Sequence, residues 1–140
     1  MSQENVEIVR RALEVFNSTA FDRGEEPDLR FYAPDVELDR SDAALDAAVY
    51  HGHDGLREWV SLLREMWEGQ RLEPLEFISI GEDRVVVPVR IVSVGRGEIE
   101  TVAHAAGVWT IREGLVTRMV TFQSKADALG AVGLGANDGR

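Results

Sequence analysis

The sequence predicts an α+β domain whose second half is a three-stranded antiparallel meander, and two observations carry this prediction. Residues 84–123 contain three runs rich in β-branched residues, separated only by short turns that contain glycine, which is typical of hairpins rather than of parallel strands with helical crossovers. Apolar residues recur at helical spacing outside this region, at 6–20, 56–67 and 126–132. The expected order is helices around one short strand, then the meander, then a short carboxy-terminal helix.

Both faces of the predicted meander are too apolar to be left in water. In its last strand, one parity holds Val116, Arg118, Val120 and Phe122, and the other holds Leu115, Thr117, Met119, Thr121 and Gln123. A sheet with one solvated face shows clean alternation of apolar and polar residues instead. We therefore expect helices of the chain to cover one face and a second copy of the chain, in a homodimer, to cover the other.

The first helix is expected from Ser2 to residue 21 or 22. Its apolar stripe comprises Val6, Val9, Leu13, Phe16 and Ala20. Gly24 interrupts this helix. After the glycine, Pro27–Tyr32 is predicted to form a short second helix that ends before Pro34, because a proline is tolerated in the first turn of a helix but not in its interior.

The segment Asp35–Arg40 alternates apolar and charged residues, and it is predicted to be a strand with one solvated side. A variable loop is expected over Ser41–Val49. A third helix is then predicted from Leu56 to near Gly69. Its apolar stripe comprises Trp59, Val60, Leu63, Met66 and Trp67.

Arg71–Ile80 is a further predicted strand, and Pro74 indicates that this strand lies at a sheet edge or contains a bulge near its start. After the meander, Ser124 is expected to cap the last helix. Asp127 stands three residues further on, as in a capping box, and Gly133 is expected to close the helix.

Length, charge and composition exclude several functions. The 140 residues fit a single domain, expected over residues 1–134, with a flexible tail at 135–140. The 25 Asp and Glu against 15 Lys and Arg give a formal net charge of −10, which repels nucleic acids and anionic membrane surfaces. Cysteine is absent, which excludes disulfides, thiolate metal sites and cysteine nucleophiles. Without a signal-peptide pattern or an apolar run of about 20 residues, the chain is expected to be soluble and cytoplasmic.

Neither a cofactor nor a metal ion is expected. His51 and His53 are two residues apart and could share one side of a metal ion, but no third ligand stands beside them in the sequence. His104 lies on the strand parity opposite Trp109. We therefore expect His104 in the dimer face, where it could titrate near neutral pH.

Four segments, taken in their order and spacing, carry a family resemblance: Tyr32–Glu37, Gly52–Trp59, Val108–Val116 and Ala126–Leu134. With them, nearly the whole chain resembles the SnoaL-like polyketide cyclase family of the nuclear transport factor 2-like superfamily. The resemblance implies a cone-shaped fold, in which a strongly curved, mostly antiparallel sheet wraps a long helix. It also implies an apolar pocket in the concave face and a dimer through the convex face.

The resemblance directs attention to the end of the strand predicted at Asp35–Arg40. Ketosteroid isomerase, a superfamily relative, uses an aspartate base, and the matching position at the end of this strand is Asp39 or Arg40. The alternation puts Arg40 on the pocket side and Asp39 on the outer side unless a bulge intervenes. In other relatives an acid at the end of the last long strand does acid–base work. The matching residues here include Thr121 and Gln123, which cannot act as a base unaided.

Strand parity and the implied curvature predict the residues around the pocket. Its apolar wall is expected to comprise Val36, Leu38, Trp59, Leu63, Val87, Val89, Ile91, Trp109 and Met119, and its polar groups Arg40, Tyr50, Thr121 and Gln123. Such a site suits a flat hydrophobic ligand with one or two oxygens, which Tyr50 or Gln123 could orient and Arg40 could hold. Two functions remain open. One is a cyclase- or isomerase-type enzyme that acts on a hydrophobic carbonyl compound with Asp39 and Arg40 as catalytic residues. The other is a non-catalytic ligand-binding or dimerisation module.

Overall fold

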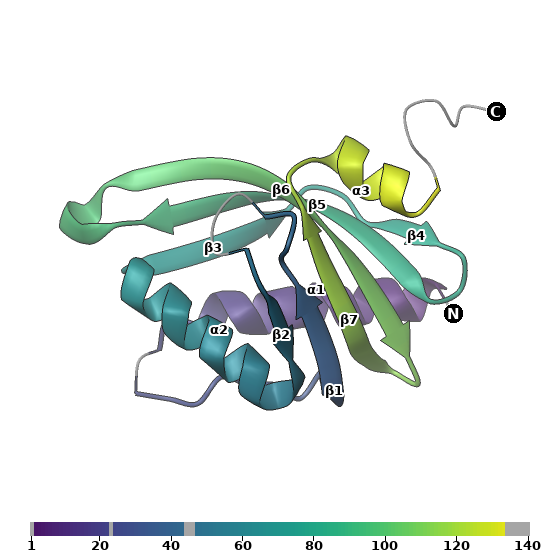
Figure 1. Ribbon diagram of the computed structural model, residues 1–140, viewed down its shortest axis with the longest axis horizontal. Helices are drawn as coiled ribbons and strands as arrows, with labels where there is room; N and C mark the ends of the chain where they lie inside the picture. The colour runs from purple at the N-terminus through teal and green to yellow at the C-terminus, as the bar shows by residue number, and fades with distance from the viewer. Residues whose placement is uncertain (1, 23, 44–46, 134–140) are drawn as a thin grey trace.

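The computed structural model of the protein describes residues 2–22, 24–43 and 47–133. This part of the chain forms three α-helices and a seven-stranded sheet (Figure 1). Their order is α1 (Ser2–Thr19), β1 (Tyr32–Asp39), β2 (Val49–His51), α2 (Gly52–Met66), β3 (Gly69–Pro74), β4 (Ile78–Ile80), β5 (Arg84–Val94), the 3₁₀ turn η1 (Arg96–Glu98), β6 (Glu100–Arg112), β7 (Leu115–Phe122) and α3 (Lys125–Ala131). The tail predicted at 135–140 and part of the loop predicted at Ser41–Val49 lie outside the described residues.

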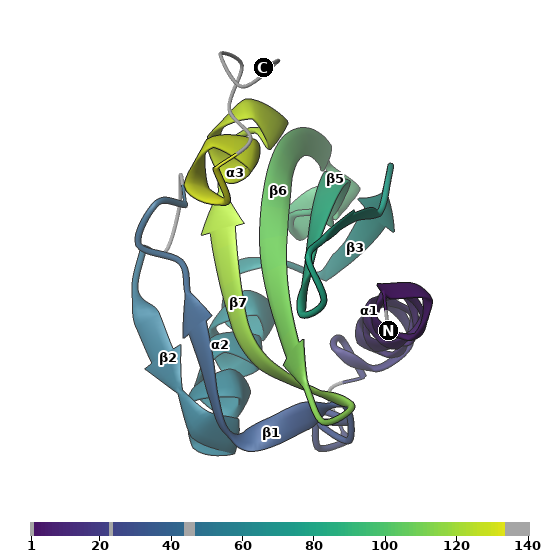
Figure 2. The ribbon, with the colours of Figure 1, turned by 90° about the vertical axis from the view of Figure 1, so that its right-hand side faces the viewer.

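The sheet has the strand order β2-β1-β7-β6-β5-β3, and the short strand β4 pairs with β5 beside this path. β1 pairs with β7 in parallel, whereas the other neighbours are antiparallel. Figure 2 shows the sheet curving around α1 and α2, with α3 beyond the end of β7. The predicted α+β class with a curved, mostly antiparallel sheet is therefore confirmed.

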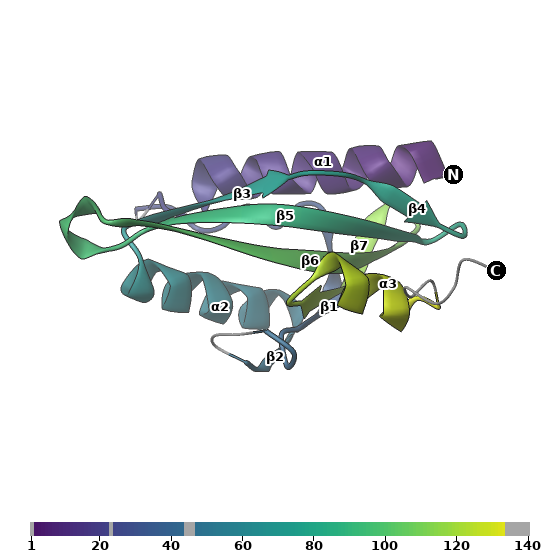
Figure 3. The same cartoon turned by 90° about the horizontal axis from the view of Figure 1, so that it is seen from above.

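Strands β5 and β6 form the longest ladder of the sheet, which runs from Arg84 opposite Thr110 to Val94 opposite Glu100. Seen from above, this hairpin lies along most of the length of the molecule (Figure 3). A tight turn then joins β6 to β7, and the two strands pair antiparallel. The meander predicted over residues 84–123 is confirmed, and it forms the centre of the sheet.

Two asparagines attach α1 to the sheet. The side chain of Asn5 donates a hydrogen bond to the backbone carbonyl of Glu82 at 2.8 Å. The side-chain amide of Asn17 donates to the carbonyl of Leu72 and accepts from its backbone amide, each at 2.9 Å. Because Leu72 lies in β3, at the edge of the sheet, Asn17 supplies hydrogen bonds that a further strand would otherwise make.

The prediction of a short helix at Pro27–Tyr32 is wrong. This segment is irregular, and β1 already begins at Tyr32. Tyr32 pairs with Val116 of β7, and the amide of Val116 donates to the carbonyl of Phe31 at 2.8 Å. Pro34 lies in an irregular stretch of β1 where no ladder pair needs its missing N–H. Tertiary pairing therefore overrides the local helix signal.

Two further element boundaries differ from those predicted. The strand predicted at Arg71–Ile80 is two strands, because β3 ends at Pro74 and a break separates it from β4. Both pair with β5, and β3 is at an edge, as the proline indicates. Helix α2 begins at Gly52, earlier than predicted, and it ends at Met66. Trp67 is thus the C-cap of α2 rather than part of its apolar stripe.

The predicted parity of the last strand fails at Val116. Arg118 pairs with Thr110 and Val116 pairs with Ile111, so Thr117 has no partner and forms a β-bulge. A one-residue bulge moves the preceding side chains to the other face of the sheet. Val116 consequently lies fully buried in the core inside the curve, whereas Arg118 stays exposed on the outer face.

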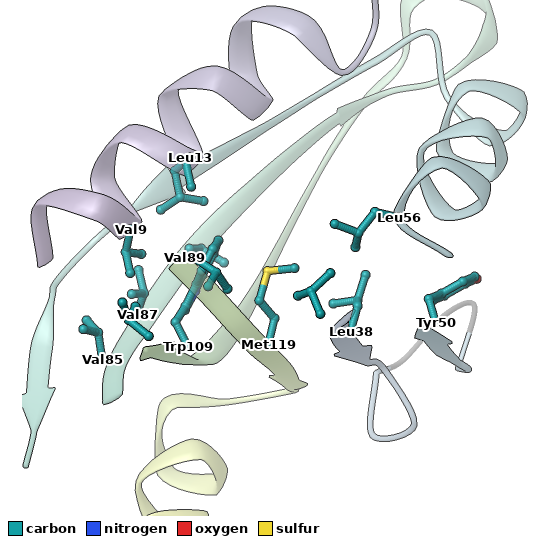
Figure 4. Packing of buried hydrophobic residues seen from close by; sticks show 14 residues of the cluster. Val9, Leu13, Leu38, Tyr50, Leu56, Val85, Val87, Val89, Trp109 and Met119 are labelled. Carbon is teal, nitrogen blue, oxygen red and sulfur yellow. The ribbon is translucent and has the colours of Figure 1, made fainter. Parts of the chain in front are cut away.

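Apolar side chains form a core on each face of the sheet. The larger core lies inside the curve and joins α1 and α2 to the meander (Figure 4). On the outer face, Ala128 of α3 packs with Val86, Ala106 and Val108, and Phe122 packs at the edge of this smaller cluster. Helix α3 therefore covers part of the outer face, which a second copy of the chain was predicted to cover.

Candidate functional site

A cavity of about 320 Å³ lies between the inner face of the sheet, α1 and α2. Most of the residues that line it are apolar: Leu13 and Phe16 from α1, Leu56, Val60 and Leu63 from α2, and Val87, Val89, Ile91, Trp109 and Met119 from the meander. In Figure 4 the side chains of Leu13, Leu38, Leu56, Val89 and Met119 extend toward the space between the two helices and the sheet. The helices and the curved sheet therefore enclose a space as well as a packed core.

All but two of the predicted wall and polar residues line this cavity. They are Leu38, Arg40, Trp59, Leu63, Val87, Val89, Ile91, Trp109, Met119, Thr121 and Gln123. Val36 is fully buried in the core instead. Tyr50 is also buried in the core, beside Gly55, where a Cβ atom would come within 3.1 Å of the Tyr50 Cβ. Tyr50 was predicted to be a polar group of the pocket, but it is not among the residues that line the cavity.

Arg40 lies directly after the last residue of β1 and lines the cavity. Its Nη1 donates to the Oγ1 of Thr121 at 3.4 Å, and its guanidinium carbon lies 5.4 Å from the ring centre of Trp59. Phe16 stacks on the same indole, with ring centres 5.7 Å apart and an interplanar angle of 26°. Residues from α1, α2, β1 and β7 therefore meet at one end of the cavity, where Gln123 also lines it.

Trp59 carries a polar atom that this arrangement leaves unsatisfied. Within the described part of the chain, its Nε1 is the buried side-chain nitrogen or oxygen that has no hydrogen-bond partner. The indole of Trp109, also in the wall of the cavity, lies close to Gly107. A Cβ atom at residue 107 would come within 3.0 Å of the Trp109 Nε1. A glycine inside strand β6 thus leaves room for the Trp109 side chain.

Asp39 lies outside the cavity lining. Its carboxylate accepts hydrogen bonds from the Ser41 hydroxyl at 2.6 Å and from the Ser41 amide at 3.0 Å, and it lies 3.5 Å from the guanidinium of Arg118. The hydrogen bonds from Ser41, with a smaller effect from the Arg118 charge, hold the pKa of Asp39 below its usual value. In this conformation Asp39 is a weak base that faces the outer side of the sheet.

Tyr32 and Asp28 line the cavity, and neither was among the predicted site residues. Burial raises the pKa of the Tyr32 phenol, and the nearby Asp28 charge adds to this effect. Arg30, which pairs with Asp28 at 2.6 Å, holds the pKa of the Asp28 carboxyl below its usual value. Tyr32 is therefore a neutral phenol beside an ionised carboxylate. Its assignment to a helix concealed it, since only a strand places it beside β7.

A second polar pair also lines the cavity. The Nε2 of Gln70, on β3, donates to the Oγ of Ser93, on β5, at 3.0 Å, and Ser93 is almost fully buried. Neither residue was among the predicted site residues. A usable signal existed, because Ser93 has the same parity as Val87, Val89 and Ile91 along β5.

Of the three histidines, only His104, which is exposed on β6, is among the residues that line the cavity, so its expected place in a dimer face stays a prediction. His53 makes a 2.9 Å hydrogen bond through Nε2 with the backbone carbonyl of Tyr32, and His51 is exposed on β2. Over the described residues, His, Asp and Glu side chains do not form a group of three that could hold a metal ion. In the same part of the chain, none of the helices is long and apolar enough to cross a membrane.

Comparison with known proteins points to one family. The family model described as a SnoaL-like domain matches residues 9–119, which is most of the chain. No curated protein matches the sequence.

Several solved structures are similar to this chain. TerC, co-crystallised with polyporic acid, is 24% identical with a TM-score of 0.72, over 93% of this chain and 98% of TerC. A Catenulispora acidiphila protein with a ketosteroid isomerase-like fold, in complex with trimethylamine, is 17% identical with a TM-score of 0.70, over 94% and 95% of the two chains. A Xanthomonas campestris protein described as a candidate polyketide cyclase is 18% identical with a TM-score of 0.71, over 94% and 98%. At these identities the likeness shows the fold alone.

Proposed function

The chain belongs to the SnoaL-like domain family, and on this basis we propose that it binds a small hydrophobic molecule with one or two oxygen atoms inside the curved sheet. The observation that carries the proposal is the cavity of about 320 Å³. Apolar side chains line most of it, and the positively charged guanidinium of Arg40 lies at one end. Ligand sites are commonly apolar hollows of this size with a few polar groups that fix the ligand's orientation.

The proposed roles follow from the position of each side chain. Trp59, Trp109 and Met119 form the wall against which an apolar ligand is buried. The guanidinium of Arg40 stabilises negative charge on a ligand oxygen, such as a carboxylate or an enolate. Thr121 and Gln123 add hydrogen-bonding groups at the same end. Tyr50 has no direct contact with the ligand in this proposal, because it is buried in the core beside Gly55 and does not line the cavity.

A second function is a cyclase- or isomerase-type reaction on a hydrophobic carbonyl compound. It is favoured by the structural likeness to proteins described as candidate polyketide cyclases. In such a reaction Asp39 would remove a proton and Arg40 would stabilise the resulting enolate. For this, Asp39 must leave Ser41 and Arg118 and turn toward the cavity. The non-catalytic binding function requires no such movement, and for this reason it is our first proposal.

The binding function is tested by calorimetric titration with hydrophobic aromatic ketones, aromatic carboxylates and polyporic acid. We expect at least one class to bind, and Arg40→Ala to weaken the binding of the oxygen-bearing probes at least about tenfold, since a hydrogen bond to a charged group is lost. Arg57→Ala is the matched control, because Arg57 lies on α2 but pairs with Asp54 and Glu26 outside the cavity lining. If none of these probes binds the wild-type protein at millimolar concentration, the proposal is wrong.

The same probes separate binding from catalysis. Exchange of the α-protons of bound ketones in deuterated buffer would support the enzyme, and its loss in Asp39→Asn would identify Asp39 as the base. Exchange that persists in Asp39→Asn removes Asp39 from that role. Binding without exchange leaves the non-catalytic function as the better account.

A further inference from the structure

The indole N–H of Trp59 is a buried hydrogen-bond donor without an acceptor among the described residues. Folded proteins rarely leave a buried donor unpaired. One explanation for such a donor is that it binds a molecule that is not part of the chain. An indole nitrogen can only donate. The missing partner is therefore a hydrogen-bond acceptor.

The two side chains that lie against the faces of the Trp59 ring cannot supply this acceptor. Phe16 stacks on the indole and the guanidinium of Arg40 lies over it. Neither side chain has an acceptor atom, and the N–H bond lies in the plane of the indole, away from contacts made through its faces. Trp59 lines the cavity, so a molecule held there lies against the same side chain.

We propose that the indole N–H of Trp59 donates a hydrogen bond to an oxygen of the ligand, so that Trp59 acts as a polar recognition residue rather than only as part of the apolar wall. This inference rests on the proposed binding function and adds the ligand's chemistry to it. The ligand presents a carbonyl or carboxylate oxygen beside Trp59 and Arg40, and its apolar body lies along Val89, Trp109 and Met119.

This arrangement predicts discrimination between ligands of equal shape. Trp59 and Arg40 both donate and neither accepts, so a ligand oxygen is matched twice at this end of the cavity. A hydrocarbon of the same size fills the apolar part but leaves the indole N–H unpaired, as does a ligand whose polar group can only donate. Sites that hydrogen-bond a ligand's polar group reject the analogue without it much more strongly than apolar walls reject a missing methylene.

The test uses three probes that share one ring system: 2-acetylnaphthalene, 2-naphthoate and 2-isopropylnaphthalene, which are a ketone, a carboxylate and a hydrocarbon. Binding is measured for the wild type, Trp59→Phe and Trp109→Phe. Trp59→Phe keeps an aromatic ring beside Phe16 but removes the N–H. We expect it to weaken the ketone or the carboxylate about tenfold and the hydrocarbon less than about threefold. Trp109→Phe is the control that changes the wall, and it should affect all three probes similarly.

Nuclear magnetic resonance of the indole N–H groups provides an independent readout, because the chain has three tryptophans and Trp59→Phe assigns the signal of Trp59. We expect this signal to move downfield with the ketone or the carboxylate and to move less with the hydrocarbon. The oxygen-bearing probe with the larger shift identifies the acceptor. If Trp59→Phe fails to fold, Trp67→Phe and Trp109→Phe assign the other two signals, and the remaining signal is that of Trp59.

The outcomes separate this inference from the binding function on which it rests. If the hydrocarbon binds as tightly as the other probes and Trp59→Phe weakens all three equally, the cavity binds ligands but Trp59 is only a wall residue. An indole signal that stays unchanged while the oxygen-bearing probes bind means that water satisfies the donor, and it overturns the inference. If no probe binds, both proposals are wrong.

Discussion

Arg64, on α2, donates hydrogen bonds to the residues at the end of α1. Its guanidinium donates to the backbone carbonyls of Ala20, Asp22 and Glu25, the last two at 3.0 and 3.1 Å. These carbonyls belong to the residues that follow α1, where the helix no longer supplies hydrogen-bond partners. One side chain thus holds the end of α1 and the chain leading to β1 against α2, and it helps to fix the part of the cavity lined by residues 27–29.

Replacing Arg64 by Met should lower the free energy of unfolding by about 2 kcal/mol, because three backbone carbonyls, of which that of Ala20 is partly buried, lose a charged donor. Urea unfolding measures the change. Arg57→Met is the control on the same helix: its ion pairs with Asp54 and Glu26 are exposed, and such pairs contribute less than about 1 kcal/mol. Equal losses in the two variants would contradict the proposed role of Arg64.

Tyr32 is expected to make the stability of the folded protein decrease at alkaline pH. Burial raises the pKa of its phenol, so above pH 10, the ordinary tyrosine value, the folded state keeps a proton that the unfolded state releases. Stability is therefore complete below about pH 10 and falls above it, by at most about 1.4 kcal/mol per pH unit. Few other groups titrate in this range, because the chain has two tyrosines and one lysine.

Chemical unfolding between pH 8 and 11 checks this prediction. The wild type should lose stability above pH 10, and Tyr32→Phe should lose clearly less. The matched control is Tyr50→Phe, which removes the other phenol. If Tyr32→Phe and the wild type show the same pH dependence, the titrating group lies elsewhere.

Strand parity predicted much of the candidate site at the residue scale. Arg40 and Thr121 share the inner side with Leu38 and Met119 because alternation is a local property of an extended chain. The orphan N–H of Trp59 could not be predicted, since it depends on which atoms two helices and a strand end bring around one ring. Contacts of that kind are absent from any periodic pattern.

At the scale of elements, the start of α3 was predicted from its capping residue. Ser124 has an extended backbone, and its hydroxyl accepts a hydrogen bond from the amide of Asp127 at 3.1 Å. Ser124→Ala should therefore cost about 1 kcal/mol of stability in urea unfolding, and it should leave the affinity for the naphthalene probes unchanged because Ser124 is not part of the cavity lining. A loss of affinity at unchanged stability would make Ser124 a binding residue.

The elements that were mispredicted depend on contacts distant in sequence. The Pro27–Tyr32 segment has the proline signal of a helix start, but Tyr32 is held by β7, more than 80 residues away. The bulge at Thr117 is a feature of register between β6 and β7. It changes the face of the sheet on which Val116 lies, and no glycine or proline at the bulge itself marks its position in the sequence. The meander was predicted correctly because its turns and its period are both local.

At the scale of the molecule, the apolar character of both sheet faces predicted that both would be covered. The inner face is covered by α1 and α2, which together leave the cavity. On the outer face α3 covers the cluster around Val86 and Val108. The sequence showed that a short last helix exists but not where it packs, since its apolar residues fit either face.

The outer side of the β5–β6 hairpin lies beyond α3, and here we expect two copies of the chain to associate. Val102 is 48% exposed and Ile99 is 68% exposed, and both are apolar. Near Val102 on this face, Arg90 is already paired with Glu73, so its charge would not oppose contact with an apolar partner. A second copy offers the same surface by two-fold symmetry.

Sedimentation of the wild type at micromolar concentration should therefore show a dimer. Val102→Asp should weaken association by about 2–4 kcal/mol, because it buries an unpaired charge in the interface. Val102 is a better site for this test than Val120, which packs against the cluster under α3, where a charge would damage the fold itself. Leu75→Asp is the matched control, since Leu75 is 58% exposed between β3 and β4. A wild-type monomer would refute the dimer, and a dimer that persists in Val102→Asp would place the interface on another surface.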